Sequence, residues 1–149
     1  MAVAASGTAS EDELRAAEAV GRELAARGAV LVSGGLGGAM EAACRGAKDA
    51  GGSTVGILPG PDRAEANAFV DVAIATGLGE ARNALVVRSA DAVIAVGGGW
   101  GTLSEIALAL RAGKRVVGLD TWEVGRDGRP VEGVVAAGSP EEAVALALG

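Results

Sequence analysis

Two glycine-rich segments, each placed between an apolar run and a helix-like segment, constrain this chain most strongly. Residues 34–38 read Gly-Gly-Leu-Gly-Gly and follow the apolar run 29–33. Residues 97–101 read Gly-Gly-Gly-Trp-Gly and follow the apolar run 90–96. Glycine permits a positive φ and a close approach of the backbone to other groups. Both segments are therefore typical of strand-to-helix turns in a parallel α/β sheet.

The rest of the chain repeats this alternation of strand-like and helix-like apolar patterns. We expect strands at residues 3–5, 29–33, 54–58, 70–75, 90–96, 115–119 and 131–135. We expect helices at residues 10–27, 39–50 and 79–89, a fourth after the second glycine segment through residue 111, and a fifth from residue 139. Residues 120–130 are expected to form an irregular excursion. The pattern predicts one α/β domain over residues 1–149, a single-domain Rossmann-like parallel sheet with helices on both faces.

Composition removes several kinds of chemistry. The chain has no histidine and one cysteine, Cys44, which excludes a Ser-His-Asp triad, an intrachain disulfide and an ordinary zinc site, and we expect no bound metal. The net charge of −6, without a basic stripe, disfavours nucleic acid and membrane surfaces as partners. A lone cysteine and the lack of a leader-like or membrane-spanning run favour a cytoplasmic protein.

The two glycine turns have a functional and a purely structural interpretation. In parallel sheets ligands bind beyond the carboxyl ends of the strands, and the N-terminus of the following helix attracts phosphate. The alternative is that each turn is only a tight connection in a glycine-rich chain. Neither turn matches G-x-G-x-x-G or a Walker A sequence. Asp120, at the end of a later strand, keeps a dinucleotide site open as a third interpretation.

Three further residues each have more than one interpretation. Glu105 either closes a capping box that begins at Thr102, or faces the ligand as an acid, base or hydroxyl acceptor. Arg82 is either a surface arginine paired with Glu80 or Asp91, or an oxyanion contact. Trp100 is a lid over the ligand, a pocket wall or an interface residue.

The chain resembles the LOG family, which includes the cytokinin-activating phosphoribohydrolases. The resemblance rests on the segment 33–40, on Gly-Ile-Leu-Pro at residues 56–59, on Arg82, and on Gly-Gly-Trp-Gly-Thr-Leu-Ser-Glu at residues 98–105. The last string is similar to the family motif P-G-G-x-G-T-x-x-E. Within the superfamily, Arg82, Asn83 and Gly97 place the chain closest to the branch that contains the molybdenum cofactor carrier protein. Nothing in the sequence supports the lysine decarboxylase activity by which many relatives are labelled.

The resemblance implies roles for particular residues. Arg82 and Glu105 match the catalytic pair, Gly98, Gly99, Gly101 and Thr102 match the loop that holds a 5′-phosphate, and Gly34 and Gly35 match the turn that closes the pocket. The implied reaction is hydrolysis of a nucleoside 5′-monophosphate to the base and ribose 5-phosphate, with no cofactor required. The alternative is a non-catalytic carrier for a phosphorylated cofactor such as the molybdenum cofactor.

Departures from the motif bear on this choice. Gly97 replaces the motif proline, Trp100 stands where tyrosine is usual, and Asn83 replaces a lysine. These departures favour the carrier, whereas the retained Arg82 and Glu105 favour the enzyme. The resemblance also implies a homodimer or homotetramer. The expected helix supports this, because its residues 84–87 are all apolar and one core-facing stripe needs fewer apolar positions.

Overall fold

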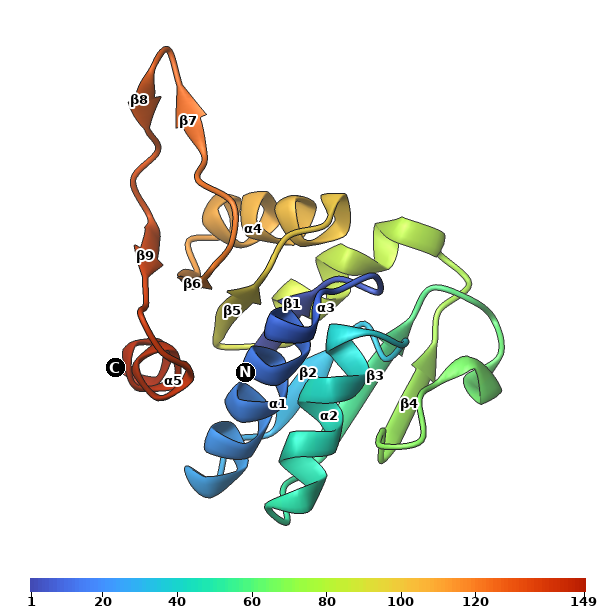
Figure 1. Ribbon diagram of the computed structural model, residues 1–149. Helices are drawn as coiled ribbons and strands as arrows, with labels where there is room; N and C mark the ends of the chain where they lie inside the picture. Colours follow the sequence, from blue (N-terminus) through green and yellow to red (C-terminus); the bar gives the residue numbers. More distant parts are fainter.

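The computed structural model describes all 149 residues and contains one large parallel sheet (Figure 1). Its strand order is β4-β3-β2-β1-β5-β6-β9, and every neighbouring pair is parallel. The strands are β1 (Ala2–Ala5), β2 (Leu31–Ser33), β3 (Thr54–Leu58), β4 (Val72–Ala75), β5 (Ala92–Val96), β6 (Arg115–Leu119) and β9 (Val134–Ala136). The order reverses direction at β1, because β2, β3 and β4 follow on one side and β5, β6 and β9 on the other. The predicted α/β class and Rossmann-like sheet are confirmed.

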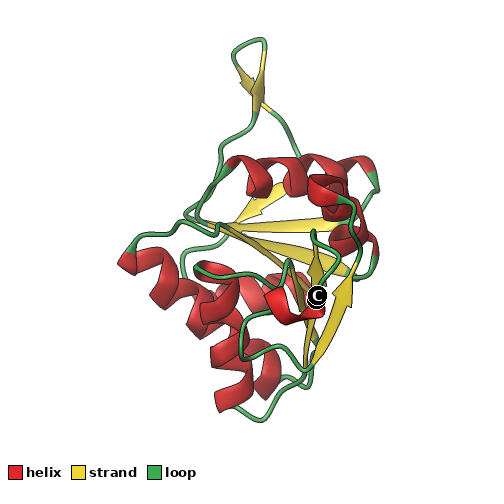
Figure 2. Ribbon diagram, turned by 90° about the vertical axis from the view of Figure 1, so that its right-hand side faces the viewer, coloured by secondary structure: helices red, strands yellow, loops and turns green.

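Helices cover both faces of the sheet (Figure 2). One apolar cluster joins the sheet to α1 (Glu11–Ala26), α2 (Ala39–Asp49) and α5 (Pro140–Leu148). A second joins the opposite face to α3 (Asn83–Arg88) and α4 (Trp100–Arg111). In β1, Val3 belongs to the first cluster, whereas Ala2 and Ala4 belong to the second. A strand buried on both faces needs an unbroken apolar sequence, which is the pattern seen in the sequence.

Two glycines outside the turns bring α1 and α2 into close contact. A Cβ on Gly21 would lie 1.9 Å from the carbonyl oxygen of Ala43, and one on Gly46 would lie 1.9 Å from that of Glu18. The helix backbones therefore touch where a side chain would otherwise separate them. These positions give part of the glycine excess a packing role that the sequence analysis did not assign.

The boundaries of several elements differ from those predicted. The expected helix 79–89 begins with a 3-10 turn, η2 (Gly79–Arg82), before α3. Residues 63–65 form a second 3-10 turn, η1 (Arg63–Glu65). The expected irregular excursion contains a short hairpin of β7 (Gly125–Arg126) and β8 (Arg129–Pro130), which projects from the body (Figure 1). The last strand starts at residue 134 instead of 131.

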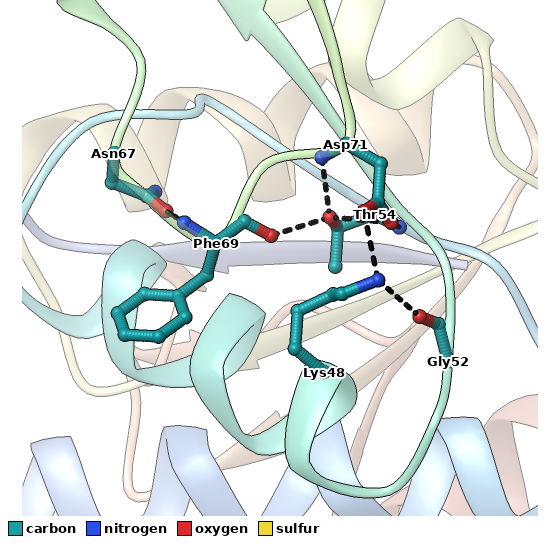
Figure 3. A network of polar contacts seen from close by, with 6 residues as sticks. All are labelled: Lys48, Gly52, Thr54, Asn67, Phe69 and Asp71. Carbon is teal, nitrogen blue, oxygen red and sulfur yellow. Dashed lines mark hydrogen bonds and ion pairs between the residues drawn. The ribbon is translucent and has the colours of Figure 1, made fainter.

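A polar network explains why β4 starts at Val72 and not at residue 70 (Figure 3). The Asp71 carboxylate accepts hydrogen bonds from the Thr54 amide at 2.9 Å and hydroxyl at 3.2 Å. The Thr54 hydroxyl in turn donates to the Phe69 carbonyl at 2.6 Å and accepts from the Asp71 amide at 2.9 Å. Lys48 lies 2.7 Å from Asp71, and this ammonium is the main reason that the pKa of Asp71 is lowered. The Asp71 amide also donates to the Thr54 carbonyl at 3.2 Å, and the Val70 amide bonds back to Asn67 in a turn, so side chains supplement the backbone pairing where β4 begins.

Candidate functional site

The turn after β5 leaves a row of backbone amides open at the start of α4. Gly99 is the N-cap residue, and its side chain can supply no capping oxygen. The amides of Gly99, Trp100, Gly101 and Thr102 have no hydrogen-bond acceptor within the chain. The N-terminus of a helix attracts anions through such amides and the helix dipole. The first turn of α4 is therefore suited to phosphate.

The first part of the same turn is already occupied by the protein. The Glu13 carboxylate accepts a hydrogen bond from the Gly98 amide at 3.2 Å and from the Ser10 amide at 2.7 Å. Gly97 has φ of +61°, and a Cβ on it would lie 2.0 Å from Glu13 Oε1. Proline holds φ near −65° and could not take this conformation. The departure from the motif proline at Gly97 is thus required by the local backbone.

A cavity of about 310 Å³ lies in front of these amides. Its walls come from the loop after β1, from Leu36 and Met40 at the turn after β2, from Pro59 after β3, from η2 and α3, and from the first two turns of α4. The predicted site residues that line it are Arg82, Gly99, Gly101, Thr102 and Glu105. It lies at the carboxyl edge of the sheet beside β1, where the strand order reverses, which is where such sheets bind ligands.

Glu105 lies in the second turn of α4 and is 5% exposed. It makes no capping contact, so the capping-box interpretation is wrong; the helix starts three residues earlier than a cap at Thr102 requires, because Gly99 is the N-cap. No group in the chain donates a hydrogen bond to its carboxylate. Burial raises the pKa of Glu105 to about 8, against the opposing charge of Arg82. The side chain is therefore mostly a neutral acid at pH 7.

Arg82 is 9% exposed and forms no ion pair. The interpretation as a surface arginine paired with Glu80 or Asp91 is wrong, because η2 turns the side chain into the cavity wall. Its guanidinium donates to the Asn83 side-chain oxygen, and Asn83 donates to the Ser104 hydroxyl at 2.9 Å. Burial lowers the pKa of Arg82, while Glu105 and Glu80 oppose this shift. The guanidinium remains a cation at neutral pH.

Two buried polar atoms at this site have no hydrogen-bond partner. They are Nε of Arg82 and Oγ1 of Thr102. Buried donors and acceptors are almost always paired, so an unpaired set calls for an explanation. Both residues line the same cavity. The polar groups that have no partner in the chain, including the open amides of α4, therefore gather around one cavity.

The other predicted glycines lie behind the cavity. A Cβ on Gly34 would lie 2.6 Å from Arg82 Nη2 and 2.8 Å from Met40 Sδ. Gly35 has φ of +72°, and its carbonyl accepts from the Asn67 amide at 2.9 Å and side chain at 3.2 Å. Neither glycine lines the cavity: Gly34 makes room for Arg82, and Gly35 makes room for Leu58 and the backbone of Gly56. Gly98 does not line it either, and its contact with phosphate stays a prediction.

Some cavity residues escaped the sequence analysis. Ser6 and Gly7 line the cavity from the loop after β1, and Glu80 and Asn83 line it from η2 and α3. Residues 6–8 come directly after the expected strand 3–5, but they were not predicted to be part of the site. Their position after the strand adjacent to β5 was the signal that could have included them.

A second hollow, of about 690 Å³, lies between β6, β9 and the β7–β8 hairpin. Asp120 lines this hollow and not the cavity at α4, so it stands apart from the candidate phosphate site. The hollow holds none of the unpaired buried atoms. In the structure, no three carboxylate or thiol side chains gather to ligate a metal, and no helix has the length and apolarity to cross a membrane.

Comparison with known proteins places this geometry in a family. An uncharacterised protein of Archaeoglobus fulgidus is 48% identical over 142 residues, covering 95% of this chain and 89% of the relative. The structure of the molybdenum cofactor binding protein of Rippkaea orientalis is similar, with a TM-score of 0.88, 39% identity, and coverage of 97% of this chain and 92% of that one.

The Moco carrier protein of Chlamydomonas reinhardtii is similar to the same degree, with a TM-score of 0.85, 40% identity, and coverage of 97% and 91%. The model of the SLOG cluster4 family matches residues 1–144. The resemblance to LOG-like proteins is thereby confirmed: this chain belongs to the SLOG cluster4 family.

Proposed function

We propose that this protein binds a phosphorylated cofactor of the molybdenum cofactor type and carries it without changing it chemically. Two similar structures, at 39% and 40% identity, are named for binding or carrying that cofactor. The observation that carries the proposal is the set of unpaired polar groups around one cavity, namely the α4 amides, Arg82 Nε and Thr102 Oγ1.

In this proposal the ligand phosphate lies against the first turn of α4. The amides of Gly99, Gly101 and Thr102 donate to its oxygens, and the Thr102 hydroxyl and Arg82 guanidinium complete the shell. Glu105, neutral at pH 7, adds no negative charge and can donate a hydrogen bond of its own. The pterin and metal parts of the ligand are cargo, and no group of three carboxylate or thiol side chains gathers at the cavity to hold the metal.

Calorimetric titration with molybdenum cofactor released from a molybdoenzyme tests the proposal. Thr102→Val removes only the unpaired hydroxyl, so we expect binding to weaken about tenfold while stability is kept or raised. Arg82→Gln removes the cation and is expected to weaken binding further. Arg88→Gln, on the exposed side of α3, is the matched control and should bind normally.

No binding by the native protein would overturn the proposal. Equal losses in Arg82→Gln and Arg88→Gln would show that the contribution of arginine is a general effect of charge and not a contact in the cavity.

A second candidate function is hydrolysis of the N-glycosidic bond of a nucleoside 5′-monophosphate. Glu105 favours it, because a buried carboxyl group with a pKa near neutrality suits proton transfer at physiological pH. Water would add to the ribose carbon, the carbon–nitrogen bond would break, and the base would leave with a proton. Release of ribose 5-phosphate from a panel of monophosphates, abolished by Glu105→Gln, would support it. If the protein binds the monophosphates but releases no ribose 5-phosphate, hydrolysis is contradicted and the carrier function remains.

We also propose that the protein forms a homodimer or homotetramer. Leu85 on α3 is exposed, although Val86 and Val87 beside it are buried. Val72, Ile74 and Leu78 add further exposed apolar side chains around β4. Light scattering tests this proposal, and a uniform monomer at micromolar concentration would contradict it.

A further inference from the structure

The chain contains three aromatic residues, and two of them meet beside the mouth of the candidate cavity. Trp100 is the first residue of α4 and lines the cavity, while Trp122 follows β6. Their ring centroids are 5.2 Å apart, with planes inclined by 32°. The third aromatic residue, Phe69, packs against the apolar cluster on the α1 face. The pairing of the two tryptophans therefore calls for its own explanation.

Trp122 has a structural role. Its indole N–H donates to the Gly99 carbonyl at 3.1 Å, and a Cβ on Gly98 would lie 2.8 Å from the same nitrogen. Thr121 beside it donates to the Gly97 carbonyl. These contacts fasten the segment after β6 onto the turn before α4, and they leave Trp122 half-buried.

Trp100 has no comparable structural role. Its side chain is 79% exposed and makes no hydrogen bond, and Trp122 is its one aromatic neighbour. A large indole exposed to this degree contributes little to the folded core. Its ring is nevertheless held by Trp122 on one side, with much of its apolar surface left open to solvent. The indole is thus a supported aromatic surface at the mouth of an anion-binding cavity.

We propose that Trp100 is a stacking platform for a planar fused-ring heterocycle, such as a pterin or a purine, whose attached phosphate binds at the first turn of α4. This inference rests on the proposed function, because the phosphate site positions the ligand. Aromatic faces stack well on heterocycles, and such contacts are sequence- and substituent-tolerant. Since Trp100 is itself in the first turn of α4, one helix end holds the phosphate and the ring together.

The position of the platform has a consequence for the ligand. The phosphate lies against buried groups, whereas the ring lies at the cavity mouth beside an exposed side chain. A cofactor held in this way keeps its ring end accessible to a receiving protein. Trp100 therefore selects ligands that have a ring, and the cavity behind it selects those that have a phosphate.

The experiment compares ligands with and without a ring. Calorimetry measures the binding of ribose 5-phosphate, guanosine 5′-monophosphate and 6-hydroxymethylpterin phosphate to the native protein, Trp100→Ala and Trp100→Phe. We expect the ring-bearing ligands to bind more tightly than ribose 5-phosphate. Trp100→Ala should weaken them by roughly 5- to 100-fold and leave ribose 5-phosphate unchanged. Trp100→Phe should recover most of the loss.

Fluorescence gives an independent readout. The chain has no tyrosine and two tryptophans, so Trp122→Phe leaves Trp100 as the sole tryptophan emitter. Guanosine 5′-monophosphate should quench that emission, and ribose 5-phosphate should not. The inference is overturned if ribose 5-phosphate binds as tightly as both ring-bearing ligands, or if Trp100→Ala affects all three ligands equally. The proposed function stands in those cases, and it falls together with the platform if no phosphorylated ligand binds at all.

Discussion

The two glycine-rich turns look alike in sequence, but the loop after β1 closes over the first amide of α2 in one, whereas the first amides of α4 stay open in the other. At the turn after β2, the first amide of α2, that of Ala39, donates to the Ser6 carbonyl at 2.9 Å. A Cβ on Gly38 would lie 2.3 Å from the Gly7 carbonyl oxygen. The loop after β1 therefore closes over the first residue of α2, and the Met40 and Glu41 amides behind it have no acceptor in the chain. At the turn after β5, the first amides of α4 have no acceptor in the chain.

The difference shows what makes a glycine turn into a ligand site. Glycine only permits close approach: at Gly38 the approaching group is the backbone of the loop after β1, whereas at Gly97 and Gly98 it is the side chains of Glu13 and Trp122, which leave the following amides open. Two carboxyl groups near the turn after β5 differ in a similar way, since one is hydrogen-bonded by the protein and the other is not. Glu13 accepts backbone hydrogen bonds, and the Ser10 amide is the main cause of its lowered pKa. Glu105 accepts none, and its pKa is raised.

The largest effect is expected from Glu105 and pH. Its folded-state pKa, about 8, lies above the ordinary value of 4.5, so the folded state binds the proton more tightly. The stability that this proton contributes is fully present below about pH 4.5, and it is lost progressively as the pH rises to the folded-state pKa of about 8. Relative to Glu105→Gln, the native protein should lose on the order of 4 kcal/mol between pH 5 and pH 9. Urea unfolding of both proteins at the two pH values measures this, and parallel pH profiles would show that Glu105 ionises normally.

The closed turn can be tested through Gly38. With φ of +67° and a backbone oxygen 2.3 Å from the added Cβ, Gly38→Ala should lower the free energy of unfolding by about 3 kcal/mol or more. The matched control is Gly28→Ala, which has φ of +72° and no atom within 4 Å of the added Cβ. Its cost should be the conformational strain alone, about 1 to 2 kcal/mol. Equal losses in urea unfolding would mean that contact with the loop after β1 adds nothing.

The sequence was sufficient to predict the parallel sheet, because unbroken apolar runs such as residues 90–96 are buried on both faces. The resemblance to the LOG family pointed to Arg82, Thr102 and Glu105, which lie together in one cavity, and their roles stay predictions. The short hairpin within residues 120–130 was not predictable, since its two-residue strands carry no apolar alternation.

What fills each turn was beyond the sequence. Glu13 and Gly98 are 85 positions apart, and only the packing of α1 beside β5 brings them together. Trp122 likewise reaches Gly99 across 23 positions. A motif identifies the residue types at a turn, but whether an amide is free depends on side chains that arrive from other elements. For this reason Gly98 and Gly99, adjacent in the motif, have different surroundings.

The open turn can be tested by filling it. Gly99→Val keeps an ordinary backbone conformation, because φ is −92°, but its Cβ would lie 2.9 Å from Ser6 Oγ, between two residues that line the cavity in front of the α4 amides. Binding of a phosphorylated ligand should weaken about 100-fold or more as these amides are obstructed. Gly37→Val, in the turn after β2, is the control, since only the end of the Glu41 side chain lies near its Cβ. Titration calorimetry measures the affinity of both variants. A comparable loss of affinity in Gly37→Val would contradict the assignment of the phosphate to the turn after β5.

The smallest effect concerns the side chain that braces the closed turn. Asn67 donates to the carbonyls of Gly35 and Leu36 at 3.2 and 2.9 Å and accepts from the Phe69 amide at 3.0 Å (Figure 3 shows the last contact). Asn67→Ala should cost about 1 to 2 kcal/mol, because the half-buried carbonyls then turn to water for part of their bonding. Ligand binding should stay unchanged, since Asn67 does not line the cavity. Hydrogen exchange should locate the loosening at residues 67–69, where the Phe69 amide loses its acceptor and the amide of residue 67 donates to the Gly35 carbonyl. If exchange at residues 103–106 of α4 rose instead, the two turns would be coupled, and the contrast between a closed and an open turn would no longer describe independent regions.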